Sequence, residues 1–173
     1  MIWLYFCKTA EKERTLLRLL REKTGIEPHI CRNEYGKPYA EGNKIFFNIS
    51  HSGDICAIAV SDNPVGVDTE KTCGKERGAV LSRLTAREKS ETEDERGFLR
   101  NWTAKESYVK FKGARIWDYI KRLEFFGGKL YLDGEDTREE IRFYETERLT
   151  VAVCADDARF EIENNAEFSP NDI

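Results

Sequence analysis

A helix followed by two strands is predicted twice along this chain, and this repeated order limits the possible fold more than any other feature of the sequence. Residues 11–25 carry leucines at helical spacing and end at Gly25, a natural helix stop, and the strand pair after them ends in "AIAVSD". Residues 101–113 form a second helical pattern, and a later strand pair ends in "VAVCADD". We therefore predict an α+β fold with two halves packed against each other and a cleft between them.

Short apolar runs between turn residues predict most of the remaining elements as strands. These strands are expected at residues 1–7, 44–50, 55–61, 65–71, 123–126, 129–132, 140–145 and 149–155. The pattern favours further helix at 78–84 and 85–90, an exposed loop at 90–97 and turns at 33–43. The predicted boundaries are an N-terminal half at 1–64, a C-terminal half at 65–163 and a polar tail at 164–173.

Composition excludes several classes of protein. The net charge of −4 lacks the basic excess of a duplex nucleic-acid binder. The five cysteines form no C-x-x-C pair, so we expect reduced thiols, and with only two histidines a zinc site is improbable. No apolar run approaches the ~20 residues of a membrane span and the N-terminus lacks a signal-peptide pattern, so we expect a soluble, cytoplasmic protein.

Two acids lie side by side on the predicted strand "VGVDTE". Alternation along a strand puts Gly66, Asp68 and Glu70 on one face, where the two carboxylates repel each other. Either this face is a solvated strand edge, or a cation binds there. Gly66, on the same face, would leave room for a ligand to approach the backbone.

A third acid, Glu106, borders the apolar stripe of the helix predicted at 101–113. The simplest interpretation is an ordinary i,i+4 pair with Lys110, contributing ~0.3–0.5 kcal/mol. However, residues 105–122 carry six basic residues against two acids. Carboxylates beside lysines are typical of sites where Mg²⁺ meets phosphate, and a set of oxygen donors favours Mg²⁺ over zinc.

The strand end "FNISHSGD" adds hydroxyls and an imidazole that could meet an anion. A lone histidine such as His51 is more often structural than functional. Neither the phosphate-binding loop of nucleotide hydrolases nor the glycine-rich dinucleotide loop is present.

The motifs "YGKP", "FNISHSGD", "VGVDTEK" and "WTAKESYVKFKG" occur in this order. Together they resemble the surfactin-synthetase-activating type of 4′-phosphopantetheinyl transferase, and "FYETERLTVAVCA" resembles the closing hairpin of that family. The resemblance implies two α+β halves related by a pseudo-two-fold axis, with the site in the cleft between them. It also implies Mg²⁺-dependent transfer of phosphopantetheine from coenzyme A to a serine of an acyl or peptidyl carrier protein, with release of 3′,5′-ADP.

By motif position, the resemblance assigns the metal ligands to Asp68, Glu70 and Glu106. Lys110 falls at the lysine that contacts the pyrophosphate, and we expect Lys105 to face the same metal and coenzyme. Glu106 and Lys110 would thus take part in the reaction.

The remaining assignments concern coenzyme A and the general base. Ser50 and His51 match residues near the 3′-phosphate, Lys37 matches the basic residue of "YGKP", and Arg14 matches an arginine of the coenzyme-binding helix. Glu88 lies near an acid proposed as general base in the family, although Thr85 to Glu88 also form a ready-made capping box. The chain departs from the family by lacking a basic segment between its first strand and first helix, and Lys8 or Lys12 could take the place of that segment in binding coenzyme A.

Two other functions fit the same residues. One is a Mg²⁺-dependent pyrophosphate hydrolase, and the other is a non-catalytic module that binds carrier protein or coenzyme A. The sequence also predicts that Lys112, Arg115, Lys121 and Arg122 attract an acidic carrier protein, the alternative being a solvated basic face. A monomer would suffice, since both halves belong to one chain.

Overall fold

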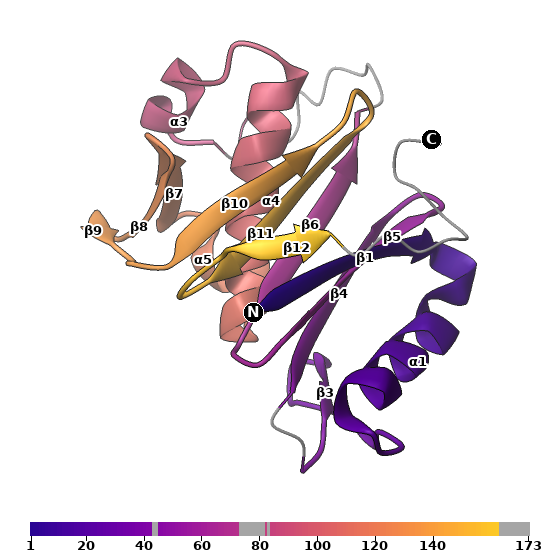
Figure 1. The fold of residues 1–173 in the computed structure, drawn as a ribbon. Helices are drawn as coiled ribbons and strands as arrows, with labels where there is room; N and C mark the ends of the chain where they lie inside the picture. The colour runs from indigo at the N-terminus through magenta and orange to yellow at the C-terminus, as the bar shows by residue number, and fades with distance from the viewer. Residues whose placement is uncertain (43–44, 73–81, 83, 163–173) are drawn as a thin grey trace.

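The computed structural model describes residues 1–42, 45–72, 82 and 84–162. Two main sheets with a long helix on each outer side form the centre of the fold, and two smaller sheets lie beside them (Figure 1). The first half contains β1 (Ile2–Lys8), the 3-10 turn η1 (Thr9–Glu11), α1 (Lys12–Thr24), β4 (Phe46–Ser52) and β5 (Ile55–Ser61). A short hairpin of β2 (Ile30–Arg32) and β3 (Pro38–Ala40) lies between α1 and β4 in the sequence. The first sheet has the strand order β12-β1-β5-β4, where β12 is the last described strand, Phe160–Ile162.

The second half, like the first, runs from one strand through a long helix to an antiparallel pair of strands. It contains β6 (Gly66–Lys71), α3 (Ala86–Ser90), α4 (Glu95–Lys112), α5 (Ile116–Tyr119), β10 (Glu140–Glu145) and β11 (Leu149–Ala155). Its main sheet has the order β10-β11-β6, and β7 (Leu123–Phe126), β8 (Lys129–Leu132) and β9 (Glu135–Asp136) form a separate small sheet. The antiparallel orders β1-β5-β4 and β6-β11-β10 correspond strand for strand.

Side-chain alternation along the strands explains the layers. One face of the first sheet, including Tyr5 and Ile58, packs against Leu16, Leu19 and Leu20 of α1. The opposite face packs against the second sheet, in a buried cluster of Ile2, Leu4, Phe6, Ile55, Ala57, Ala59, Val65, Val67, Leu149, Val151, Val153, Ala155 and Ala158. The other face of the second sheet contributes Cys154 to a cluster with Ala104 and Tyr108 of α4. The layers therefore run helix, sheet, sheet, helix.

The halves pack against each other through this apolar core, which fills the centre of their interface. One difference from the prediction concerns β12 (Phe160–Ile162), which pairs in parallel with β1 although residues 65–163 were predicted to form the second half. The chain thus returns to the first sheet after completing the second.

Most predicted elements are confirmed, and the differences have local causes. Helix α4 begins at Glu95, inside the predicted exposed loop, because Asp94 accepts a hydrogen bond from the Gly97 N–H as an N-cap. The predicted turns at 33–43 include β3, which pairs with β2. The predicted helix at 78–84 and the tail at 164–173 lie wholly or mostly outside the described residues.

Candidate active site

The two halves are joined along β4 and β6 by side chains of β4. Asn48 Oδ1, Ser50 Oγ and Ser52 Oγ accept hydrogen bonds from the backbone N–H groups of Val67, Thr69 and Lys71, at 2.8, 3.2 and 3.1 Å. Residues 48, 50 and 52 lie on one face of β4 because side chains alternate along a strand. This seam brings the hydroxyls of "FNISHS" against the acids of "VGVDTE".

Asp68 is the most buried acid at the seam, with 5% of its surface exposed. Its Oδ1 accepts hydrogen bonds from Ser50 Oγ at 2.7 Å and Lys110 Nζ at 2.6 Å. Its Oδ2 is also buried and has no hydrogen-bond partner among the described residues. Because a buried polar atom without a partner is costly, Oδ2 is the atom of this site most in need of a ligand.

The other acids lie close to Asp68. Glu70 Oε2 accepts a hydrogen bond from Ser52 Oγ at 3.0 Å. Glu106 makes no hydrogen bond or ion pair within the part of the chain that the structure describes, and its pKa is raised to about 7. Burial is the largest cause, and the negative charges of Asp68 and Glu70 add to it, whereas Lys110 opposes the rise.

Lys110 does not form the ordinary helical pair with Glu106. Its ammonium instead bonds to Asp68 and to Ser50 Oγ, the latter at 2.9 Å, so it crosses from α4 to both strands of the seam. This position puts a positive charge next to Asp68 and near enough to Glu106 to oppose the rise of its pKa.

Gly66 has a different role from the one predicted. A Cβ placed on it would lie 2.0 Å from Ser107 O and 2.5 Å from Phe111 N, both backbone atoms of α4. The space beside Gly66 is therefore filled by the helix, and the prediction that it admits a ligand is wrong. The glycine instead lets α4 pack closely on β6, which brings Glu106 and Lys110 to Asp68.

A cavity of about 490 Å³ lies on the α1 side of β4. Apolar side chains line much of it, among them Leu16, Leu17 and Ile49. Three groups that can carry positive charge, Lys12, Arg32 and His51, also line it, together with one acid, Glu13. An apolar hollow with cationic groups suits a flat base attached to phosphate.

One known protein family matches the part of the chain that contributes most of the seam residues. The family model described as the 4′-phosphopantetheinyl transferase superfamily matches residues 64–155, which is more than half of the chain and includes β6, α4 and β11. The chain belongs to this superfamily. The matched region carries Asp68, Glu70, Glu106 and Lys110.

Individual phosphopantetheinyl transferases are similar over longer stretches. A transferase of Salmonella typhi, AcpT, is 35% identical over 103 residues, which cover 54% of each chain. The Sfp transferase of Bacillus subtilis is 33% identical over 140 residues, covering 70% of this chain and 60% of Sfp. The human L-aminoadipate-semialdehyde dehydrogenase-phosphopantetheinyl transferase is 32% identical over 143 residues, covering 74% of this chain and 45% of the human protein. The chain spans about half the length of the curated relatives it matches.

Within this superfamily member, Glu88 and Lys105 form a buried ion pair away from solvent. Both side chains are 0% exposed, and Lys105 Nζ lies 3.0 and 3.2 Å from the two Glu88 oxygens. Glu88 also accepts hydrogen bonds from the N–H groups of Thr85 and Phe125, so it links α3, α4 and β7. The sequence predicted that Lys105 faces the metal and that Glu88 acts as the general base, directly or through water, whereas here both side chains are buried against each other.

Two further predicted coenzyme contacts lie elsewhere. Arg14 is exposed, pairs with Glu11 at 3.5 Å and is not among the residues that line the α1 cavity, whereas Lys12 is. Lys37 donates a hydrogen bond to the carbonyl of Lys110, near the C-terminal end of α4. Burial, the largest cause, lowers the Lys37 pKa to about 8. Arg32, which sequence reasoning missed, lines the cavity from β2.

The basic residues predicted to attract a carrier protein are partly neutralised. Lys112 pairs with Glu139, and Arg122 pairs with Asp133. Arg115 is exposed and stacks over the Tyr35 ring, with its guanidinium carbon 5.4 Å from the ring centre. Lys121 is exposed and makes no ion pair with any described residue. The remaining basic surface is therefore Arg115 and Lys121.

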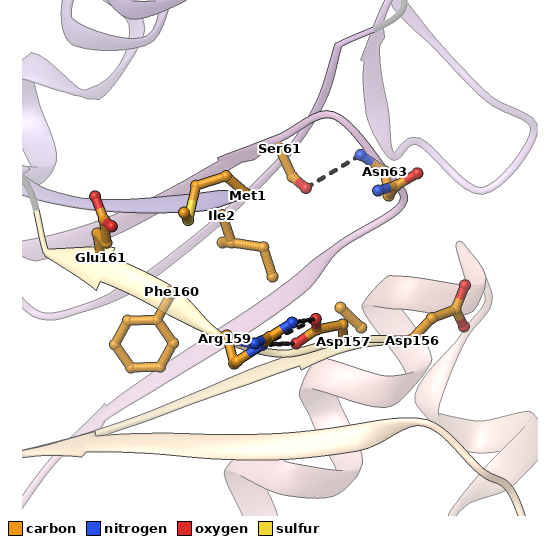
Figure 2. A pocket seen from close by; sticks show the side chains of 10 residues that line it. Met1, Ile2, Ser61, Asn63, Asp156, Asp157, Arg159, Phe160 and Glu161 are labelled. Atoms are coloured by element: carbon orange, nitrogen blue, oxygen red, sulfur yellow. Dashed lines mark hydrogen bonds and ion pairs between the residues drawn. The ribbon is translucent and has the colours of Figure 1, made fainter.

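A separate cavity of about 550 Å³ lies beside β12, and Figure 2 shows its lining. An ion pair of Arg159 with Asp157 and a hydrogen bond from the Asn63 N–H to Ser61 Oγ border it. None of the predicted site residues is among those that line it.

None of the described helices has the length and apolar character needed to cross a membrane.

Proposed function

We propose that this protein transfers 4′-phosphopantetheine from coenzyme A to a serine of an acyl or peptidyl carrier protein and releases 3′,5′-ADP. The observation that carries the proposal is the seam between β4 and β6, where Asp68, Glu106 and Lys110 meet. Membership of the superfamily supports the reaction type. The surfactin-synthetase-activating subtype and a pseudo-two-fold relation between the halves are part of the same proposal, the latter supported by the matching strand orders.

The residues at the seam fit Mg²⁺. Asp68, Glu70 and Glu106 offer oxygen donors only, and Asp68 Oδ2 is a buried oxygen without a partner among the described residues. Their ligand atoms do not all lie within 4.8 Å of one another. This arrangement still suits Mg²⁺, which takes one or two carboxylates and completes its coordination with water and phosphate oxygens. Bound there, Mg²⁺ would supply charge stabilisation to the pyrophosphate.

The side chains of this protein account for binding and charge. The α1 cavity would hold the adenosine end of coenzyme A, with Lys12, Arg32 and His51 near its phosphates. Lys110, whose ammonium lies at the seam, would stabilise negative charge on the departing 3′,5′-ADP. The serine hydroxyl of the carrier would attack the phosphorus that bears pantetheine. Glu88 would have to become exposed before it could accept the serine proton.

The decisive experiment is the intact mass of apo-carrier proteins from fatty-acid, polyketide and nonribosomal-peptide synthesis. After incubation with this protein, coenzyme A and Mg²⁺, we expect at least one carrier to gain the mass of one phosphopantetheine, with 3′,5′-ADP released in equal amount. EDTA should prevent the gain. Coenzyme A cleaved without modification of any carrier would instead indicate a hydrolase, and binding without chemistry would indicate a non-catalytic module.

Asp68→Asn tests the site itself. The variant keeps the size of the side chain but removes the charge that Lys110 and a metal would share, so we expect transfer to fall at least about 100-fold. Asp156→Asn makes the same change at an exposed aspartate just after β11 and should leave transfer unchanged. Full activity of Asp68→Asn would show that the seam is not the active site.

His51→Ala tests the coenzyme side. If His51 lies near the 3′-phosphate, the variant should lose much more affinity for coenzyme A than for 3′-dephospho-coenzyme A. The other histidine, His29, does not line the cavity, so His29→Ala is the matched control. Equal losses for both ligands would make His51 a structural residue.

A further inference from the structure

The β2–β3 hairpin and the residues that flank it bring three possible metal ligands to one face. Cys31 lies directly opposite Tyr39 in the antiparallel register. The pairing continues one step further, because the Glu41 N–H donates a hydrogen bond to the His29 carbonyl at 2.9 Å. His29 and Cys31 are two residues apart on one strand and therefore share a face, and Glu41 lies across from His29 on that same face.

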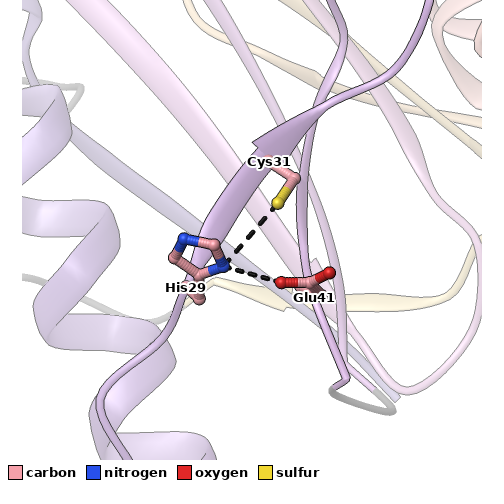
Figure 3. A group of neighbouring side chains, drawn as sticks. All are labelled: His29, Cys31 and Glu41. Carbon is pink, nitrogen blue, oxygen red and sulfur yellow. Dashed lines mark hydrogen bonds and ion pairs between the residues drawn. The ribbon is translucent and has the colours of Figure 1, made fainter.

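The side chains of these three residues converge. His29 Nδ1 lies 2.7 Å from Glu41 Oε2 and 3.7 Å from Cys31 Sγ (Figure 3). One ligand atom from each residue lies within 4.8 Å of the others. Among the residues that the structure describes, this is the only such group of three or more histidine, cysteine or acidic side chains.

We propose that His29, Cys31 and Glu41 bind a zinc ion, separate from the Mg²⁺ site at the seam. A nitrogen, a thiolate and a carboxylate oxygen match the preferences of Zn²⁺, whereas an oxygen-only set favours Mg²⁺. Three protein ligands leave a fourth position for water. The Cys31 thiol loses its proton to solvent when the metal binds.

The distances are close to those that tetrahedral zinc requires. Zn–S and Zn–N bonds of about 2.3 and 2.0 Å put a sulfur and a nitrogen ligand about 3.5 Å apart. The separation of Cys31 Sγ from His29 Nδ1, 3.7 Å, is already near this value. The 2.7 Å contact between His29 and Glu41 must open by roughly half an ångström. Both side chains can adjust, since they are 76% and 60% exposed.

The position of this site links it to the candidate active site. The turn of the same hairpin contacts the end of α4, where Lys37 donates to Lys110 O and Asn33 Nδ2 donates to Gly113 O at 3.3 Å. A metal that joins the two ends of the hairpin would hold β2 and β3 together at the point opposite this turn. We therefore expect zinc to stabilise the hairpin against local opening.

The test uses the full chain freed of metal with EDTA and then titrated with Zn²⁺ or Co²⁺ alone. We expect one Zn²⁺ per chain by calorimetry, and with Co²⁺ a thiolate-to-metal charge-transfer absorption that reports a bound cysteine. Cys31→Ser should remove this absorption, and His29→Ala or Glu41→Gln should weaken Zn²⁺ binding at least tenfold. Matched controls are Cys73→Ser and His51→Ala, which should bind Zn²⁺ as the unmodified protein does.

The outcome is independent of the proposed transferase activity, because none of the three ligands belongs to the seam. Circular dichroism and carrier modification in Mg²⁺ should be unchanged in the three variants, which would exclude misfolding. Persistence of the cobalt–thiolate absorption in Cys31→Ser would overturn the proposal. So would weak binding at several sites that none of the three substitutions alters, or no binding by the unmodified protein.

Discussion

Glu106 carries a charge that the unliganded protein tolerates poorly. Its pKa is raised from 4.5 to about 7, with burial as the largest cause. Between these values the folded chain keeps a proton that the unfolded chain has lost, so stability falls as pH rises from about 4.5 to 7. The destabilisation is fully expressed above pH 7, and allowing for partial exposure it is on the order of 2 kcal/mol.

Glu106→Gln should remove this cost. With EDTA present, we expect the variant to melt about 5 °C above the unmodified protein at pH 8 and within about 2 °C of it at pH 5. Glu93→Gln, at an exposed position, should show no such trend. A difference between variant and unmodified protein that is equal at both pH values would contradict the raised pKa.

At the scale of residues, the motifs predicted which side chains would gather but not which would pair. "VGVDTEK" and "WTAKESYVKFKG" indicated Asp68, Glu106 and Lys110 correctly as neighbours. Helical spacing could not predict that Lys110 bonds to Asp68 instead of Glu106, because that choice depends on how α4 crosses β6. Burial of Lys105 against Glu88 was likewise hidden, since both occur in motifs that also suit an exposed site.

At the scale of elements, the contact of α4 with β6 depends on one missing side chain. Gly66→Ala would place a Cβ within 2.5 Å of two backbone atoms of α4, which cannot move aside as a flexible side chain could. We expect a loss of at least about 3 kcal/mol in the free energy of unfolding, measured with urea. Transfer should also fall, because Asp68 would separate from Lys110.

Gly97→Ala, on the helix α4 that packs against Gly66, is the matched control. There the nearest atom to a new Cβ is 3.4 Å away and the backbone conformation is one that alanine adopts. Stability should be unchanged or higher by up to about 1 kcal/mol. If both substitutions cost the same, close packing at Gly66 is not the cause.

The Glu88–Lys105 pair holds α3 and β7 to α4. Lys105→Met would leave Glu88 buried without its counter-charge, and we expect a loss of about 3–5 kcal/mol in unfolding free energy. The double variant Glu88→Gln with Lys105→Met should regain part of this loss, since glutamine carries no charge and its single side-chain oxygen can still accept from one of the Thr85 and Phe125 N–H groups. A single variant as stable as the unmodified protein would refute the burial of the pair.

The extent of each element was harder to predict than its existence. The run at 90–97 was interpreted as a loop because it is rich in charge, yet Asp94 caps a helix that begins within it. An aspartate can cap a helix or lie in a loop, and only the apolar residues that follow it distinguish these two roles. Here Phe98 and Leu99, both buried against Trp102, favour a helix that starts at Glu95.

At the scale of the whole molecule, the recurrence of a helix and a hairpin predicted two halves but not their contact. Apolar side chains on both faces of β5 and β11 signal a buried sheet without saying what covers each face. The pairing of β12 with β1 and the register of the β2–β3 hairpin depend on contacts distant in sequence, which local patterns do not contain. The His29–Cys31–Glu41 cluster was missed for the same reason.

The distribution of charge over the molecule bears on how an acidic carrier would be captured. The protein has a net charge of −4, so attraction must come from a local surface. Of the four basic residues predicted for this role, Lys112 and Arg122 are engaged by Glu139 and Asp133. Arg115 and Lys121 remain, on either side of α5, whose Trp117 is 64% exposed.

Reversing these two charges tests the surface. Arg115→Glu with Lys121→Glu should raise the KM for the carrier about tenfold at low salt and flatten its dependence on salt, because exposed charges act mainly on encounter and are screened beyond ~8 Å. Coenzyme A affinity should not change. Lys112 is left intact, because its reversal would face the nearly buried Glu139 and disturb the fold. Arg142→Glu with Lys129→Glu makes the same change in net charge on β10 and β8, and an equal rise in KM there would show that total charge, not this surface, governs capture.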